Sequence, residues 1–178
     1  MPLTPVQRGV LRGMASAMAV TIIVFLIAVK TNIFPHPVSN TLPDRAIFVG
    51  TWGMAIVAWL ALCIGALARH RFLSDKDIDG SGLTKGSNRA IILQAVLQNT
   101  LEQVTLAGFV YGSCAILLPY HWLPVIPASA LLFSLGRALF FRGYGSGAAA
   151  RALGFGLTFY PTIALLGLCI VNGIFDFS

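Results

Sequence analysis

The chain has 178 residues, of which 57% are hydrophobic and only 10% are charged, and its mean hydropathy is +0.82. This composition excludes an ordinary soluble globular domain and indicates an integral membrane protein, whose first partner is the lipid bilayer. The net charge of +6 does not indicate a nucleic-acid-binding protein, because the basic residues are spread over several short segments between apolar stretches.

Five apolar stretches can cross a bilayer, which takes about 20 residues. They cover residues 14–29, 47–68, 90–118, 121–141 and 147–174. The first follows Arg8 and Arg12, as in a signal peptide, but it lacks a small-x-small cleavage pattern, so we interpret it as a retained helix. Pro124, Pro127 and Pro161 favour a packed bundle, in which neighbouring helices cover the backbone groups that proline leaves free.

Basic residues predict the orientation of these stretches. Ten of the twelve lysines and arginines flank the N-terminus, the loop after the second stretch or the loop after the fourth, and only Lys30 and Arg45 flank the other side. The positive-inside rule then predicts a multi-pass protein with a cytoplasmic N-terminus and its C-terminus on the opposite side. For a bacterial source we expect the inner membrane.

Two features could suggest a metal site. The cysteines, Cys63, Cys114 and Cys169, lie far apart in apolar runs, so we interpret them as packing residues. Residues 75–80 (DKDIDG) match the first half of an EF-hand calcium loop, but position twelve of that loop is Gly86 instead of a bidentate glutamate. We therefore predict a solvated turn and no metal site.

The third stretch contains the only glutamate of the chain, Glu102. A carboxylate near the centre of a membrane helix costs about 2.5 to 3.5 kcal/mol, so it indicates a functional site. On a helical wheel it lies at the centre of a polar half that also holds Gln94, Gln98, Asn99 and Gln103. We expect this half to point into the bundle, toward an oligomer interface or into a water-filled cleft. The alternative is that it only joins helices through hydrogen bonds.

Cations and a tyrosine gather around the loop after the fourth stretch: Arg137, Arg142, Tyr144 and Arg151. Arg137 lies roughly one and a half to two turns deeper in the membrane than Tyr144, so we expect it to meet the carboxylate of Glu102 from a neighbouring helix. The alternative is that these arginines reflect topology and extend toward the membrane surface.

The pair Asn99-x-x-Glu102, followed by Arg137-x6-Tyr144-x6-Arg151, resembles the family of membrane-associated proteins in eicosanoid and glutathione metabolism, MAPEG. The resemblance implies a four-helix membrane bundle that assembles as a homotrimer and uses glutathione. It covers about residues 47–174, so the first stretch is an additional transmembrane helix. We therefore predict an all-α protein with an N-terminal helix and connecting loop in residues 1–46 and a MAPEG-like four-helix domain in residues 47–178.

The resemblance also implies roles for five residues. Asn99 and Glu102 would bind the polar backbone of glutathione, with Glu102 at its amino group. Arg137 would support a carboxylate, and Tyr144 would contact the tripeptide. Arg151 would be the catalytic residue that stabilises the thiolate, which agrees with the lowering of a thiol pKa by a nearby cation.

These residues lead to a first hypothesis, a microsomal-type glutathione S-transferase or peroxidase that conjugates or reduces apolar electrophiles or lipid hydroperoxides, with glutathione as co-substrate. The second is a non-enzymatic lipid- or amphiphile-binding protein of the same fold. It is motivated by Ala95, where well-known members carry arginine, and by Phe140, where they often carry a polar or tyrosine side chain. A third, a proton-coupled carrier that uses Glu102, is less favoured because no inverted repeat is visible.

Overall fold

The computed structural model describes residues 2–80, 83 and 85–175. Within these residues the chain is entirely helical, without a strand. The elements are α1 (Pro5–Lys30), α2 (Leu42–Phe72), α3 (Asn88–Leu117), the short 3-10 helix η1 (Tyr120–Trp122), α4 (Val125–Gly143), a second 3-10 helix η2 (Tyr144–Ser146) and α5 (Ala148–Phe175). The predicted all-α fold with an extra N-terminal helix is therefore confirmed.

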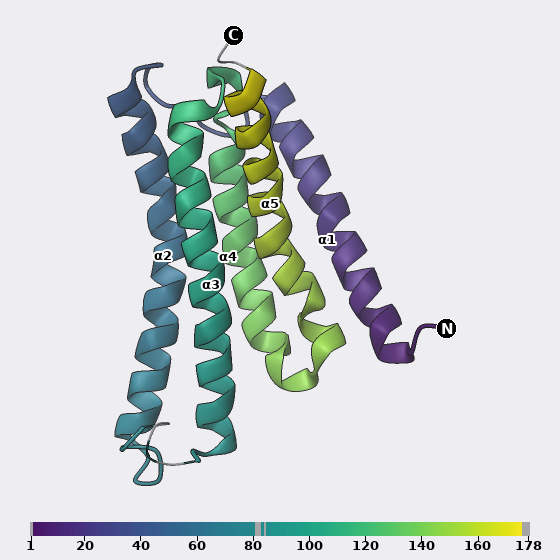
Figure 1. The fold of residues 1–178 in the computed structure, drawn as a ribbon, viewed down its shortest axis with the longest axis vertical. Coiled ribbons are helices and arrows are strands. Elements are labelled where there is room, and N and C mark those ends of the chain that lie inside the picture. Colours follow the sequence, from purple (N-terminus) through teal and green to yellow (C-terminus); the bar gives the residue numbers. More distant parts are fainter. Residues whose placement is uncertain (1, 81–82, 84, 176–178) are drawn as a thin grey trace.

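The five long helices lie side by side, and each runs antiparallel to the next in the chain (Figure 1). The N-terminus, the α2–α3 loop and the α4–α5 turn share one end of the bundle, which we call the N-terminal end. The C-terminus, the α1–α2 connection and η1 lie at the other, the C-terminal end. All five helices are long and apolar enough to cross a membrane, so the chain is an integral multi-pass membrane protein.

α1 begins at Pro5, nine residues before the apolar stretch from which it was predicted. The side chain of Thr4 accepts a hydrogen bond from the backbone N–H of Gln7, and the Gln7 side chain accepts one from the backbone N–H of Thr4 at 2.8 Å. This reciprocal cap, together with a proline in the first turn, starts the helix in polar sequence. α1 therefore carries Arg8 and Arg12 as helical residues at the N-terminal end.

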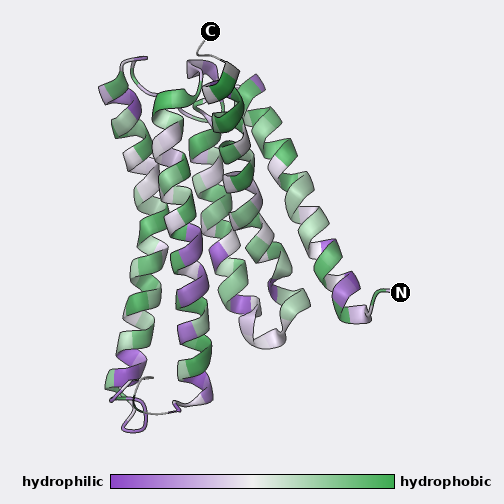
Figure 2. Ribbon diagram, in the orientation of Figure 1, coloured by the Kyte–Doolittle hydropathy of each residue, from purple (hydrophilic) through white to green (hydrophobic). Residues whose placement is uncertain are grey.

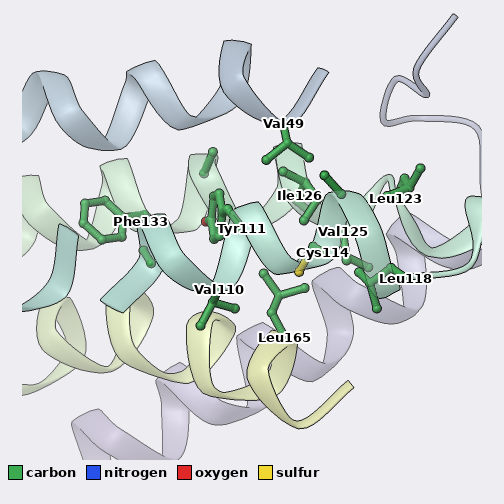
Figure 3. Packing of buried hydrophobic residues seen from close by; sticks show 14 of the residues in the cluster. Val49, Val110, Tyr111, Cys114, Leu118, Leu123, Val125, Ile126, Phe133 and Leu165 are labelled. Atoms are coloured by element: carbon green, nitrogen blue, oxygen red, sulfur yellow. The ribbon is translucent and has the colours of Figure 1, made fainter. Parts of the chain in front are cut away.

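The largest hydrophobic core fills the half of the bundle toward the C-terminal end (Figure 3). Its side chains come from all five helices and interdigitate around Tyr111 of α3, Phe133 of α4 and Leu165 of α5, each at most 2% exposed. Leu123 and Ile126 close the core below η1 and are fully buried. In lipid this close packing, more than removal from water, holds the helices together.

Glycines let α4 and α5 approach closely near the N-terminal end. A Cβ on Gly136 would come within 2.7 Å of the carbonyl oxygen of Gly154, so a larger residue at either position would force the helices apart. The turn between these helices, η2, ends at Gly147, whose φ of 97° favours glycine. The tight hairpin brings Tyr144, at its turn, next to Arg151 in the first turn of α5.

Hydrophilic side chains are distributed unevenly along the bundle. Figure 2 shows them on α1, α2, α3 and α4 toward the N-terminal end of the bundle and in the α2–α3 loop, whereas the half of the bundle toward its C-terminal end is mostly hydrophobic. The residues proposed from the sequence as a site therefore lie in one half of the molecule.

Candidate functional site

Arg137 of α4 is fully buried and holds the centre of the polar half of the bundle. One guanidinium nitrogen donates to Asn99 Oδ1 of α3 at 2.9 Å and to Thr100 Oγ1 at 3.4 Å, and the other donates to Thr158 Oγ1 of α5 at 2.9 Å. The Phe140 ring stacks 4.4 Å from the guanidinium carbon. The cation thus joins three helices, and no carboxylate among the described residues lies in contact with it.

The two threonines are oriented by their own helices. Thr100 donates to the backbone oxygen of Val96 at 2.8 Å, and Thr158 donates to that of Phe155 at 2.7 Å. Because each hydroxyl hydrogen is used in this way, its lone pairs face the guanidinium. Nε of Arg137 remains buried without a hydrogen-bond partner among the described residues. A desolvated cation with neither an anion nor a full set of acceptors costs free energy.

Glu102 lies elsewhere. Its side chain is exposed on the outer face of α3, where it accepts a hydrogen bond from Gln98 Nε2 at 3.0 Å. The expected ion pair with Arg137 is not formed within the chain, because the sole ion pair of the described residues is between His70 and Asp77. Residues three apart on a helix differ by about 60° in direction, so Asn99 faces α4 while Glu102 turns outward. Of the three expected surroundings of Glu102, the bundle interior is excluded.

A groove of about 380 Å³ brings three of the predicted site residues together. We call it the Arg151 groove, and its lining consists of Val10, Met14, Asn99, Phe140, Tyr144, Ala148, Arg151, Ala152 and Phe155. The guanidinium of Arg151 lies over the Tyr144 ring at 4.4 Å, and the edge of that ring packs against Phe140 with 5.3 Å between centroids. Arg137 lies directly behind the groove through its hydrogen bond to Asn99.

The chemistry of this groove combines one cation, one amide and apolar walls. Arg151 has no hydrogen-bond acceptor among the described residues, so its N–H groups are available to an anion. Arg137 uses the carbonyl oxygen of Asn99, which directs the NH2 group of that amide to other acceptors. The rings of Phe140 and Phe155 provide an apolar surface beside these polar groups. The groove can therefore hold an anionic group next to a hydrophobic molecule.

The family model for MAPEG matches residues 49–171, which is more than half of the chain. The chain belongs to the MAPEG family. No curated protein and no solved structure gives a match. The MAPEG match begins inside α2 and ends inside α5, so α1 is the additional apolar helix that was predicted. Family membership supports a membrane protein of the glutathione transferase and eicosanoid-metabolism type.

Some residues of this MAPEG site were not found from the sequence. Thr100 and Thr158 accept hydrogen bonds from Arg137, but in the sequence they resemble ordinary packing residues of apolar helices. Gly154, where α4 and α5 approach closely, was the available sign in the sequence that α5 packs next to Arg137. Val10 and Met14 of α1 lie outside the region of family resemblance. Their contribution depends on how α1 packs, which the resemblance does not describe.

The α2–α3 loop of this MAPEG protein uses one of its three aspartates for structure. Asp77 is 1% exposed, and its carboxylate accepts hydrogen bonds from Ser87 N at 2.6 Å, Ser87 Oγ at 2.7 Å and Ser74 Oγ at 2.9 Å. The bonds from Ser87 lower the pKa of Asp77 most, and those from Ser74 and His70 lower it further. Among the described residues no three His, Cys, Asp or Glu side chains are grouped to hold a metal ion.

Proposed function

We propose that this MAPEG protein is a membrane glutathione transferase-like enzyme that conjugates or reduces apolar electrophiles or lipid hydroperoxides with glutathione. The observation that supports the proposal is the Arg151 groove, where the available cation of Arg151, the amide of Asn99 and the ring of Tyr144 lie beside apolar walls. An anionic co-substrate can enter from the polar half of the bundle, and an apolar substrate can enter from lipid.

In the proposed mechanism Arg151 binds the sulfur of glutathione as a thiolate. A guanidinium lowers the pKa of a neighbouring thiol because it favours the charged form, and the thiolate is the nucleophile. The sulfur lone pair forms a C–S bond with the electrophilic carbon, the bond to the leaving group breaks, and the leaving group departs with that electron pair. The thiol proton passes to solvent when glutathione binds.

Asn99 and Tyr144 are the proposed glutathione-binding residues of the groove, and Arg137 acts through one of them. Arg137 is fully buried and hydrogen-bonds Asn99, so we assign it a positioning role in place of direct ligand contact. Glu102 lies one turn further along α3 and faces outward, toward the place where a neighbouring chain would pack. We keep it as a glutathione-binding residue of the assembled protein.

We also propose that the protein is a homotrimer, as the resemblance to MAPEG implies. Gln98 and Glu102 are exposed on a face that lipid cannot solvate, so either a neighbouring chain or a water-filled cleft must surround them, and a trimer supplies the neighbouring chain. Small residues that favour close helix packing line a neighbouring groove of about 640 Å³ between α2 and α3: Gly50, Gly53, Gly108 and Gly112. Native mass spectrometry in detergent tests this: a mass of three chains supports the trimer, and a single chain contradicts it.

The experiment for the enzymatic activity compares the wild-type protein with Arg151→Ala in the conjugation of glutathione to chlorodinitrobenzene. A cation that lowers the thiol pKa from about 8.5 to about 6.5 raises the thiolate fraction at pH 7 about 25-fold, so its removal is expected to reduce the rate by about that factor. Arg142→Ala is the matched control, because Arg142 is an exposed arginine of the same segment outside the groove, and its rate should stay within about twofold. Equal rates for Arg151→Ala and wild type would end the enzymatic proposal.

A second candidate function is a non-enzymatic lipid- or amphiphile-binding protein. It is favoured by an almost wholly apolar groove of about 610 Å³ between α1 and α5, lined among others by Phe25, Trp122 and Leu168. Stabilisation by a panel of lipids, without stabilisation by glutathione, would favour this function. The reverse pattern would remove it.

Three further statements remain predictions. The distribution of basic residues supports a cytoplasmic N-terminal end and a C-terminus on the opposite side, and the inner membrane is expected for a bacterial source. The division into residues 1–46 and 47–178 is supported by the family match, which begins at residue 49.

A further inference from the structure

α1 lies outside the MAPEG match, yet it packs along α5 through a row of small residues. Gly9, Gly13 and Ala17 follow each other at four-residue spacing and therefore share one face of α1. A Cβ on Gly9 would come within 2.7 Å of the Ala149 side chain, and one on Gly13 within 2.9 Å of the Leu153 backbone nitrogen. Such a seam lets two helix backbones approach closely, and it seats α1 at a defined position beside α5.

This seam places two side chains of α1 in the Arg151 groove. Val10 and Met14 each follow a seam glycine by one residue, and both are half-buried. They line the same groove as Tyr144 and Arg151, and the guanidinium of Arg151 lies over the Tyr144 ring. α1 therefore supplies a wall to a site whose other residues come from α3, α4, η2 and α5.

The groove restricts what can lie beside Arg151. Its volume of about 380 Å³ is near the lower limit of small-molecule sites, which run from about 300 to 1,000 Å³. Its lining includes three aromatic rings, from Phe140, Tyr144 and Phe155, and Met14 adds a thioether, which contacts rings favourably. Val10 and Met14 are the α1 side chains of this lining, so an apolar substrate that lies against these rings also contacts α1.

We propose that Val10 and Met14 of α1 determine the specificity of the Arg151 groove by limiting the size of the aromatic electrophile that binds beside Arg151. The inference rests on the proposed transferase function and narrows its substrate class. α1 holds this wall in place because its seam glycines fix the distance to α5. The residues of the wall contact the apolar part of the substrate, and Arg151 contacts the sulfur.

The test uses the full-length protein in detergent and two electrophiles with the same reactive group, chlorodinitrobenzene and its two-ring analogue chlorodinitronaphthalene. Met14→Ala should raise the ratio of kcat/KM for the naphthalene over the benzene compound by about tenfold, and Met14→Trp should lower it. Leu11→Ala is the matched control, because Leu11 is a 56% exposed α1 residue that does not line the groove, and its ratio should stay within about twofold.

A second readout does not need turnover. The thiol introduced by Met14→Cys should react more slowly with N-ethylmaleimide when unreactive dinitrobenzene is present, whereas the thiol introduced by Leu11→Cys should react at the same rate. The three native cysteines are buried and give a low background.

The two readouts separate the proposals. If the wild type conjugates neither compound but dinitrobenzene protects the introduced thiol at position 14, the transferase function is contradicted. The contact between Met14 and an aromatic ligand in the groove is then still supported. If conjugation occurs, the rate ratio decides: equal ratios in wild type, Met14→Ala and Met14→Trp overturn the wall and leave the transferase function intact. Without conjugation and without protection, both fail.

Discussion

The half of the bundle toward the C-terminal end and the half toward the N-terminal end are built by the same helices in different ways. Toward the C-terminal end, Tyr111, Leu123 and Leu165 are almost fully buried among other apolar side chains. Toward the N-terminal end, Arg137 is equally buried but is surrounded by an amide, hydroxyls and rings, and an open groove lies beside it. The first half has the features of a stabilising core, and the second has those of a site.

The difference concerns where this membrane protein buries a charged group that costs free energy. Packing of apolar side chains stabilises the helices in lipid, whereas a buried cation without an anion destabilises them. Buried ionisable groups in a membrane bundle commonly mark a functional site. We therefore expect substitutions toward the C-terminal end to reduce stability more than activity. Substitutions toward the N-terminal end should reduce activity more than stability.

The largest effect on stability is expected for Leu165→Ala in the core. Leu165 is fully buried, and its truncation leaves a cavity that costs about 2 to 4 kcal/mol. The conjugation rate per folded molecule should not change, because Leu165 does not line the Arg151 groove. Unfolding in mixed micelles measures the stability, with the exposed residue Leu135 as the control in Leu135→Ala. Equal destabilisation by both variants would contradict a packed core.

Arg137→Met should show the opposite pattern to Leu165→Ala, with weaker glutathione binding but no loss of stability. The substitution removes a buried cation whose Nε lacks a partner, while Thr100 and Thr158 keep their bonds to backbone carbonyls. The unfolding midpoint should therefore stay equal or rise. Asn99 loses the donor that orients it, so KM for glutathione should rise about tenfold, with a smaller change in kcat.

Two results would contradict this role for Arg137. A lower unfolding midpoint in Arg137→Met would make the guanidinium a stabilising centre, and an unchanged KM would remove its positioning role. Arg137→Lys is the conservative comparison, since it keeps the charge but loses the planar fork that reaches Asn99 and Thr158 together. We expect it to recover part of the glutathione affinity.

The helices and part of the candidate site could be predicted from the sequence. Apolar stretches of sufficient length predicted the number of helices, because the bilayer fixes the length that a span requires. The resemblance to MAPEG implied a common site for Asn99, Tyr144 and Arg151, and the structure places all three in one groove.

Other features depend on packing that the sequence does not specify. A helical wheel gives the angle between Asn99 and Glu102, but not which of them faces a neighbouring helix, so the expected pairing of Glu102 with Arg137 is not seen within the chain. The contribution of Met14 to the groove depends on the seam between α1 and α5, which brings together residues far apart in the sequence.

The smallest effect is expected in the α2–α3 loop, where Asp77 holds the N-terminal end by hydrogen bonds instead of apolar packing. Its pKa in the folded protein is lowered, so its carboxylate stabilises the fold above the unfolded pKa of about 4. This contribution should be lost as the pH falls below about 4. Asp77→Asn should lower the melting temperature slightly at pH 7 and show a smaller further loss in acid. A parallel acid loss in wild type and variant would contradict the role of this carboxylate.

The most direct test of the site is the melting temperature in detergent with and without glutathione. Binding to the native state stabilises it by about 2.7 kcal/mol at a ligand concentration of 100 times Kd, so the wild type should melt at a higher temperature with glutathione. Leu165→Ala should melt lower than the wild type but show a similar shift, whereas Arg151→Ala should show little or none. An unchanged melting temperature in the wild type, or an equal shift in Arg151→Ala, would contradict glutathione binding in the Arg151 groove.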